Sequence, residues 1–245
     1  MSSKSKIEFA VQMTCNSCVS AIKSVLTKNG INETDFTVDL EKELVVVETE
    51  LPSDTIKSVI EETGRRAVIK GLGGSTGKSL GAAVAMMAGT IGTCKGVVRM
   101  VQTDETTFVI DGTIDGLPVG HCQLAVHQYG DISNGCESCG GIYGCDNSKE
   151  NPIGVIGEIS AADSGRSTFR FDNKNLRVWD LIGRSIVVSS IQSTSSMSRL
   201  ACGIIARSAG LFQNTKRICA CDGVTLWDER DVPIAGPSRS KAGNS

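Results

Sequence analysis

Histidine is nearly absent from this sequence: the chain of 245 residues has only His121 and His127. Many zinc and copper sites are built from several imidazole side chains. Two histidines cannot supply such a set, so a metal centre that depends on imidazole ligands is excluded. Any metal chemistry of this chain has to use another kind of donor.

Long apolar segments and a strong charge of either sign are also missing. The longest apolar run, residues 80–91, is interrupted by glycine and is too short to span a bilayer. The first twelve residues lack the apolar core of a secretory signal peptide, so we expect a cytoplasmic protein. The net charge of −2 gives no general attraction to nucleic acid or to an anionic membrane, and neither is expected as a partner.

Cysteine, in contrast, is abundant. Ten cysteines in a chain expected in the cytosol indicate metal or redox chemistry before a secreted disulfide framework. Two of them lie in the stretch MTCNSC, residues 13–18, between a short apolar strand pattern and an amphipathic helix pattern. At a helix start, the unpaired N–H groups and the helix dipole favour thiolate over thiol. Thiolates without histidine or carboxylate neighbours suit Cu(I), so Cys15 and Cys18 are predicted to bind that ion.

A CxxC pair is not specific by itself, because it also occurs in thioredoxin-like redox sites and, when doubled, in structural zinc sites. The aromatic residue and the Gly or Pro that usually surround a thioredoxin motif are missing here, and no second pair lies close in sequence. Two cysteines buried in a small core are disfavoured as well, since Asn16 and Ser17 make the loop polar.

The first seventy residues predict a βαββαβ unit. Apolar residues recur at helical spacing before Gly30 and again before Gly64, and both glycines are typical helix ends. The predicted elements are strand 7–11, helix 18–29, strand 36–40, strand 44–49, helix 54–63 and strand 67–70. This order is that of the ferredoxin-like split βαβ fold.

With MTCNSC on its first loop, this unit resembles the heavy-metal-associated domain of copper chaperones and copper ATPases, whose signature is MxCxxC after the first strand. The resemblance implies that Cys15 and Cys18 bind Cu(I) and that Met13 turns inward to shape the loop. Arg65 falls where that family often has a basic residue that helps to neutralise the copper bis-thiolate; a solvated charge in a turn is the alternative. We assign residues 1–71 to this domain.

Residues 72–80 are predicted to be a linker. The stretch GLGGSTGKSL, residues 71–80, is close to a phosphate-binding loop, but Leu72 stands where that motif requires its first glycine. No buried parallel βα unit precedes it either. A flexible Gly/Ser linker is therefore the preferred interpretation.

From residue 81 to residue 210 the pattern changes to short β-rich segments separated by Gly, Asp, Asn and Ser. The expected strands are 82–87, 96–102, 106–114, 123–129, 167–171, 186–189 and 202–205, with long loops at 130–165 and 190–200. This pattern predicts an all-β Greek-key sandwich or barrel. The whole chain is therefore expected to be a multidomain α+β protein.

Four stretches of this segment closely resemble Cu,Zn superoxide dismutase and occur in the same order: GTIDGL (112–117), VHQYGD (126–131), WDLIGRSIVV (179–188) and RLACGIIARSAG (199–210). The resemblance covers nearly the whole segment. It implies an intrasubunit disulfide between Cys136 and Cys202, which would tie the long loop to the last strand.

The metal site of the dismutases is not carried over with their fold. The copper-binding HVH motif of that family reads Ala125-Val126-His127 here. Four other copper and zinc positions hold residues that cannot act as ligands: Ile142, Ser189, Pro152 and Val155. The dismutase site needs six histidines, so we expect no zinc in this domain. Arg199 matches the substrate-guiding arginine of the family, and both Arg199 and His127 are predicted to be hydrogen-bonded or packed residues instead.

A dismutase-like domain without metals still has the dimer surface of its family. By resemblance this self-complementary patch would include Tyr129, Gly130, Asp131 and Ile204, and a dismutase subunit would present the same patch. The expected complex is a heterodimer with Cu,Zn superoxide dismutase. A homodimer through the same surface is compatible with it.

Residues 211–245 form a tail that is too short for a core of its own and that carries Cys219-Ala-Cys221. In an extended segment, residues two apart point the same way, so these two sulfurs suit two-coordinate Cu(I). They also suit disulfide exchange, because a bond between cysteines so close in sequence would be strained and oxidising. The roles of four cysteines stay open: Cys94, Cys122, Cys139 and Cys145. A third metal cluster around Cys139 is disfavoured.

In this order, the MxCxxC domain, the metal-less dismutase-like domain and the CxC tail resemble the family of copper chaperones for superoxide dismutase. The resemblance implies a metallochaperone that receives Cu(I) from an upstream donor, docks on an immature dismutase subunit and promotes the target's intrasubunit disulfide. Cys219 and Cys221 would relay the copper and exchange the disulfide. One alternative is a true dismutase with an added metal domain, against which the histidine count argues. The other is a cytosolic copper buffer or thiol–disulfide exchange protein without a dedicated target.

Overall fold

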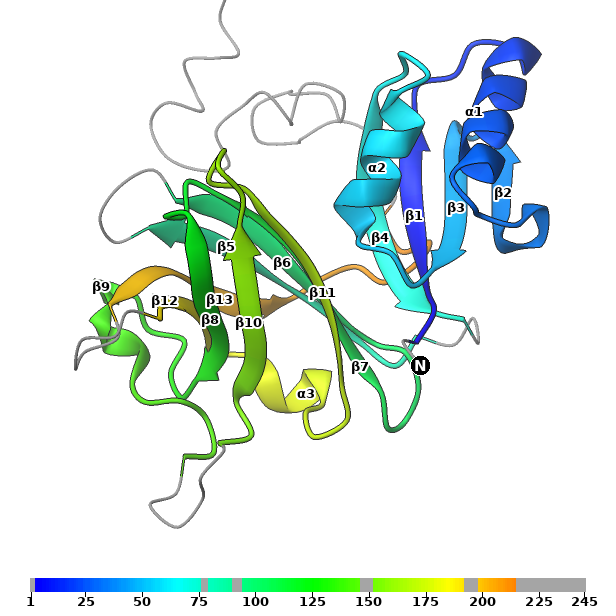
Figure 1. The fold of residues 1–245 in the computed structure, drawn as a ribbon. Coiled ribbons are helices and arrows are strands. Elements are labelled where there is room, and N and C mark those ends of the chain that lie inside the picture. The colour runs from blue at the N-terminus through cyan, green and yellow to red at the C-terminus, as the bar shows by residue number, and fades with distance from the viewer. Residues whose placement is uncertain (1–2, 76–78, 90–93, 146–151, 192–197, 215–245) are drawn as a thin grey trace, which may run out of the picture.

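The computed structural model describes residues 3–75, 79–89, 94–145, 152–191 and 198–214 in two domains (Figure 1). The N-terminal domain contains β1 (Ser5–Val11), α1 (Asn16–Lys28), the 3-10 turn η1 (Glu33–Asp35), β2 (Phe36–Asp39), β3 (Leu44–Thr49), α2 (Ser53–Glu61) and β4 (Ala67–Gly74). Its antiparallel sheet has the strand order β2-β3-β1-β4. The predicted βαββαβ order is confirmed.

The core of the N-terminal domain lies between its sheet and its two helices. β1 is an inner strand, and its alternate residues Ile7, Phe9 and Val11 belong to this core. On its other face Glu8 and Ala10 are buried as well. α1 buries Cys18, Ile22 and Leu26, which recur every four residues and so lie on one helix face. One of the predicted copper ligands, Cys18, is therefore part of the hydrophobic core.

β4 is longer than predicted. The strand expected at 67–70 continues to Gly74, so the flexible-linker prediction is wrong for residues 72–74. β1 begins at Ser5, and its first two residues pair with Gly74 and Gly73, while the Leu72 side chain is buried. These ladder pairs and the buried leucine outweigh the low strand propensity of glycine.

The second domain is a nearly closed antiparallel barrel. It contains β5 (Ala82–Gly89), β6 (Lys95–Gln102), β7 (Phe108–Asp115), β8 (Gly120–His127), β9 (Ser133–Cys136), η2 (Glu137–Cys139), β10 (Val155–Ala161), β11 (Ser167–Asn173), α3 (Val178–Leu181), β12 (Ser185–Ser190) and β13 (Arg199–Arg207). The strand order is β10-β8-β12-β13-β5-β6-β7-β11, and the two end strands lie against each other (Figure 1). The predicted all-β barrel is confirmed.

Two strands and a short helix were not predicted. β9 and β10 lie in the segment expected to be the loop 130–165, and α3 follows β11. The inward position of β10 at residue 157 is a glycine. A larger side chain would not fit there, because a Cβ on Gly157 would lie 2.8 Å from the ring of Phe171 on β11. The apolar group that fills this position comes from the neighbouring strand, so β10 itself has a weak alternating pattern.

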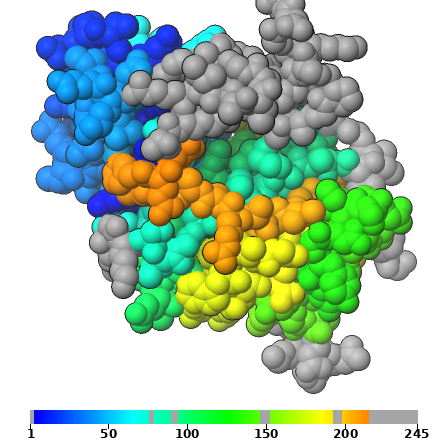
Figure 2. Space-filling model, turned by 180° about the vertical axis from the view of Figure 1, so that it is seen from behind, coloured from blue at the N-terminus to red at the C-terminus, as the bar shows by residue number. Residues whose placement is uncertain are grey.

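Several contacts join the domains, among them apolar packing and the segment that follows β13. The barrel residues Val101 and Val109 face outward and belong to the core of the N-terminal domain, and α2 is the helix nearer the barrel (Figure 1). After β13 the chain crosses to the N-terminal sheet, which Figure 2 shows as the orange segment beside the blue domain. We call residues 210–214 the strap.

The strap is bonded to the edge strand β4 and to the inner strand β1 of the N-terminal sheet. Gly210 forms a parallel bridge with Leu72 of β4, and the Phe212 N–H donates to the buried carboxylate of Glu8 on β1 at 2.6 Å. The Asn214 amide donates to the Lys70 carbonyl. The segment predicted as the start of the tail is thus attached to the first domain. Cys219 and Cys221 lie outside the described residues.

None of the helices in the described ranges combines the length and the apolar character needed to cross a membrane.

Candidate metal centre and docking surface

The cysteine pair lies at the junction of β1 and α1. Cys15 is the N-cap of α1 and has an extended backbone, with φ −161° and ψ 170°, while Cys18 lies in the first helical turn. The Cys18 N–H donates to the Cys15 carbonyl at 3.0 Å, and the two Sγ atoms are 3.6 Å apart. Cys15 is exposed and Cys18 is buried. One sulfur is therefore open to a partner, and the other is anchored in the core.

Core packing holds the loop between β1 and α1 in place. Met13 is turned inward, as predicted, and packs in the same cluster as Cys18. The backbone N–H of Gln12 donates to the Arg66 carbonyl, which attaches the loop to the residues before β4. The position of the exposed Cys15 is thus set by buried neighbours on both sides.

Hydrogen bonds to sulfur stabilise both thiolates. The pKa of Cys18 is lowered to about 6, chiefly by a hydrogen bond from the Thr14 backbone, although burial opposes this effect. The pKa of Cys15 is lowered mainly by the Ser17 hydroxyl, whose Oγ is 2.9 Å from the sulfur, and also by the Cys18 backbone. Both sulfurs also lie at the positive end of the α1 dipole. The pair is therefore a source of thiolate ligands, which are the donors that Cu(I) prefers.

The pair offers two donors from protein side chains. In the described part of the chain, no group of three or more His, Cys, Asp and Glu side chains lies together as a metal site would require. Arg65 lies in the turn before β4, and its buried Nε has no hydrogen-bond partner among the described residues. Two sulfurs with no third ligand fit a low-coordinate soft metal ion better than a tetrahedral one.

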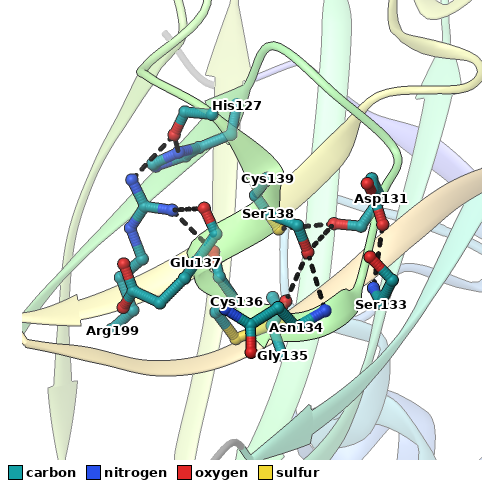
Figure 3. Close-up of a disulfide and its surroundings, with 12 residues drawn as sticks. His127, Asp131, Ser133, Asn134, Gly135, Cys136, Glu137, Ser138, Cys139 and Arg199 are labelled. Atoms are coloured by element: carbon teal, nitrogen blue, oxygen red, sulfur yellow. Dashed lines mark hydrogen bonds between the residues drawn. A yellow bond between two sulfur atoms is a disulfide. The ribbon is translucent and has the colours of Figure 1, made fainter.

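His127 and Arg199, at dismutase metal-site and substrate-site positions, are hydrogen-bonded to one backbone carbonyl (Figure 3). The His127 Nδ1 is 2.9 Å from the Gly140 oxygen, so Nδ1 carries the proton, because a carbonyl can only accept. Burial lowers the pKa of His127, and the Arg199 charge acts in the same direction. Arg199 donates to the carbonyls of Gly140 and Cys136 at 2.7 and 2.6 Å. The prediction that both residues are hydrogen-bonded is confirmed.

The structure contains the disulfide between Cys136 and Cys202, with a Cα–Cα distance of 5.6 Å. It joins the end of β9 to β13, and these two cysteines are 66 residues apart in sequence. The bond lies beside a third cysteine, Cys139, which is free and fully buried.

The residues predicted to form a partner interface lie on the β8–β9 segment and on β13. Tyr129 is 58% exposed and Ile204 is 39% exposed, both high values for large apolar side chains. Gly130 packs on the backbone of Gly183, where a Cβ would be 2.3 Å from the carbonyl oxygen. The N–H of Ile205 on β13 donates to the carbonyl of Arg184, the residue that follows Gly183. Residues 183–184 therefore hold the two parts of this surface together.

Ile132 is an exposed apolar residue beside this predicted interface, and the sequence analysis did not name it. It directly follows Asp131 in the same loop and is 45% exposed. The sequence did contain a signal for it: an isoleucine stands next to a predicted interface residue in a loop that is otherwise rich in Gly, Ser and Asn. We define the docking surface as Tyr129, Gly130, Asp131, Ile132 and Ile204.

Two family models match the chain. The heavy-metal-associated domain matches residues 8–66, and the copper/zinc superoxide dismutase model matches residues 94–205. A thiolate pair on the first domain and a dismutase-like barrel as the second define a metal-binding protein of two domains.

Curated relatives place the chain more closely. It is 47% identical to the copper chaperone for superoxide dismutase of Rattus norvegicus over 95% of this chain and 92% of the relative. It is 45% identical to that of Homo sapiens, over 96% of this chain and 93% of the relative. The chain belongs to the family of copper chaperones for superoxide dismutase.

Proposed function

We propose that this chain captures Cu(I) at Cys15 and Cys18 and delivers it to Cu,Zn superoxide dismutase. The observation that carries the proposal is the pair of sulfurs 3.6 Å apart with lowered pKa values, one exposed and one anchored. In a two-coordinate thiolate site, an incoming thiolate can bind before an outgoing one leaves. Copper is then transferred between proteins without release to water.

The docking surface is the proposed contact with the target. It combines three exposed apolar side chains on a barrel that matches the dismutase family model. A dismutase subunit would present an equivalent patch, and a two-fold related contact of this kind is self-complementary. The complex is therefore a heterodimer, and a homodimer of the chaperone uses the same surface when the target is absent.

The tail is the proposed active element after docking. Cys219 and Cys221 relay copper into the target as thiolates. After an external two-electron oxidant has converted them to a disulfide, they exchange that bond with the target: the target's two thiols become its intrasubunit disulfide, and Cys219 and Cys221 return to thiols. Two thiols separated by one residue can hold Cu(I) or be oxidised as a pair. We assign the protein to the cytoplasm, where the glutathione pool keeps such thiols reduced.

The test mixes the Cu(I)-loaded full chain with metal-depleted, disulfide-reduced Cu,Zn superoxide dismutase and follows dismutase activity. The control is the chain with Cys219→Ser and Cys221→Ser. Activation by the wild type alone supports the proposal and assigns the last step to the tail. If neither chain activates the target, a copper buffer without a dedicated target becomes the better description. Superoxide turnover by the chaperone alone would favour a true dismutase.

A further inference from the structure

Three cysteines lie together outside the barrel core. The disulfide partners Cys136 and Cys202 pack with Cys139 and Val187 in a separate buried cluster. Figure 3 shows Cys139 on the turn that begins at Cys136. The cluster therefore contains one disulfide and one thiol, which is the composition that thiol–disulfide exchange needs.

The geometry of η2 allows a second pairing of Cys136. Cys136 is the N-cap of this 3-10 turn, and Cys139 is its last residue. Residues three apart on a 3-10 helix eclipse one another and are separated by a rise of about 6 Å. That separation lies within the Cα–Cα range of about 4.4–6.8 Å in which disulfides form. Cys136 can thus bond to Cys202 across the strands or to Cys139 within the turn.

We propose that these three cysteines form a disulfide-exchange site in which Cys139 is the resolving thiol. The Cys139 thiolate attacks the Cys136 sulfur, the Cys136–Cys139 bond forms, and the Cys136–Cys202 bond breaks. Cys202 leaves as a thiolate and takes up the proton that Cys139 gave away. The number of disulfides does not change, so the step needs no external oxidant or reductant.

Arg199 supplies a positive charge at this turn. Its guanidinium donates to the carbonyls of Cys136 and Glu137 and also to that of Gly140, next to Cys139. These bonds hold the backbone of the turn that carries both Cys136 and Cys139. The residue at the substrate-guiding position of the dismutases thus has a different role in this chain.

The exchange site is bonded to the docking surface. The Cys139 thiol is 3.4 Å from the Asp131 carbonyl, and the Tyr129 N–H donates to the Cys139 carbonyl at 3.0 Å. Forming the Cys136–Cys139 bond removes the S–H donor from Asp131. On β13, Cys202 points to the same side as the exposed Ile204, because side chains alternate along a strand. The freed thiol therefore appears beside the docking surface, and this inference does not depend on the copper site.

Differential labelling of the full chain tests the proposal. The chain with the Cys136–Cys202 bond intact is alkylated under native conditions, then denatured, reduced and alkylated with a second isotopic label. Cys202 is the only cysteine in the tryptic peptide of residues 200–207, so its labelling is read without ambiguity. We expect the wild type to acquire the first label at Cys202 about tenfold or more faster than Cys139→Ser.

Cys145→Ser is the matched control, because it removes an exposed thiol that follows the same turn. The chain with Cys219→Ser and Cys221→Ser controls for attack by the tail, and both controls are expected to label Cys202 at the wild-type rate. Equal protection of Cys202 in the wild type and in Cys139→Ser overturns the proposal.

A second variant does not depend on the folding of Cys139→Ser. Cys202→Ser, oxidised in a glutathione redox buffer, is expected to contain the Cys136–Cys139 bond, seen by mass spectrometry within the peptide of residues 100–149. If this peptide carries two free thiols at these positions under the same conditions, the turn cannot close and the proposal is wrong.

Discussion

Asp111 on the barrel strand β7 accepts two hydrogen bonds from Ser53, the first residue of α2 in the other domain. The Ser53 backbone N–H donates to one carboxylate oxygen at 2.7 Å and its hydroxyl donates to the other, and both residues are 1% exposed. A carboxylate at a helix N-terminus satisfies an unpaired N–H group and interacts favourably with the dipole. The buried contact fixes α2, and with it the N-terminal domain, on the barrel.

Replacing Ser53 by alanine is expected to destabilise this domain contact. Ser53→Ala leaves a carboxylate oxygen of Asp111 buried without its hydroxyl donor, at a cost of about 1–3 kcal/mol in the free energy of unfolding. Urea titration of the full chain measures the effect. Ser58→Ala, an exposed serine on the same helix, is the control and should stay within about 0.5 kcal/mol of the wild type. Equal stability of the two variants would show that the contact contributes nothing.

The stability of the reduced, metal-free chain should rise with pH between about 6 and 9. The pKa of Cys18 is about 6 in the folded chain, against a reference value of 9.0. As the pH rises, the folded state loses the Cys18 proton at a lower pH than the unfolded state does. The contribution of the Cys18 thiolate to stability is therefore complete above the unfolded pKa and is lost as the pH falls through the folded pKa. Urea unfolding at a series of pH values measures the slope. Cys18→Ser should reduce the slope and leave the part that the lowered pKa of Cys15 contributes, and an unchanged slope would contradict the assignment.

Removal of either sulfur should abolish tight Cu(I) binding by the N-terminal domain. Changes in the second shell of a metal site already cost about 10–100-fold in affinity, and loss of one of two ligands should exceed that. Competition with a Cu(I)-specific chelator measures the affinity of Cys15→Ser and Cys18→Ser. All variants carry Cys219→Ser and Cys221→Ser, so that the tail cannot supply thiolates, and Cys145→Ser in that background is the control. Wild-type affinity in Cys15→Ser would rule out the pair as the site.

A charge on the docking surface should prevent complex formation with the dismutase. Tyr129→Asp and Ile204→Asp each place a carboxylate at a contact that excludes water, and a central interface residue contributes about 2 kcal/mol or more. Analytical ultracentrifugation with metal-depleted dismutase measures the complex. Val119→Asp introduces the same charge at another exposed apolar residue, 65% exposed between β7 and β8, and should bind as the wild type does. If all three variants bind alike, the docking surface lies elsewhere.

Local patterns predicted the N-terminal domain well, because its helices and strands carry their own apolar periodicity. The β3 strand has the predicted bounds, 44–49, and both predicted helices are present. β10 was missed since its inward position at Gly157 is filled by Phe171 from another strand. The disulfide came from resemblance to a family and not from spacing, because cysteines 66 residues apart leave many pairings open.

Contacts between domains left no trace in the sequence. Ser53 and Asp111 are 58 residues apart, and each looks ordinary in its own element. The strap is a short segment with little periodicity, so its sequence does not predict the bonds that its backbone forms with Leu72 and with the buried Glu8. For Cys139, the CxxC spacing was visible, but its place beside a disulfide depends on the η2 turn and on β13 together.

The Cys136–Cys202 bond closes a loop of 66 residues, and this loop has a consequence for the unfolded chain. A cross-link lowers the conformational entropy of the unfolded chain, and the decrease grows with the logarithm of the number of residues in the loop that it closes. Moving the bond to Cys136–Cys139 shortens the loop to one turn and returns about 2–3 kcal/mol of chain entropy to the unfolded state. The two isomers have equal numbers of thiols and equal mass, so a reagent that counts thiols cannot separate them. Their melting temperatures are therefore expected to differ, so calorimetry can follow the exchange.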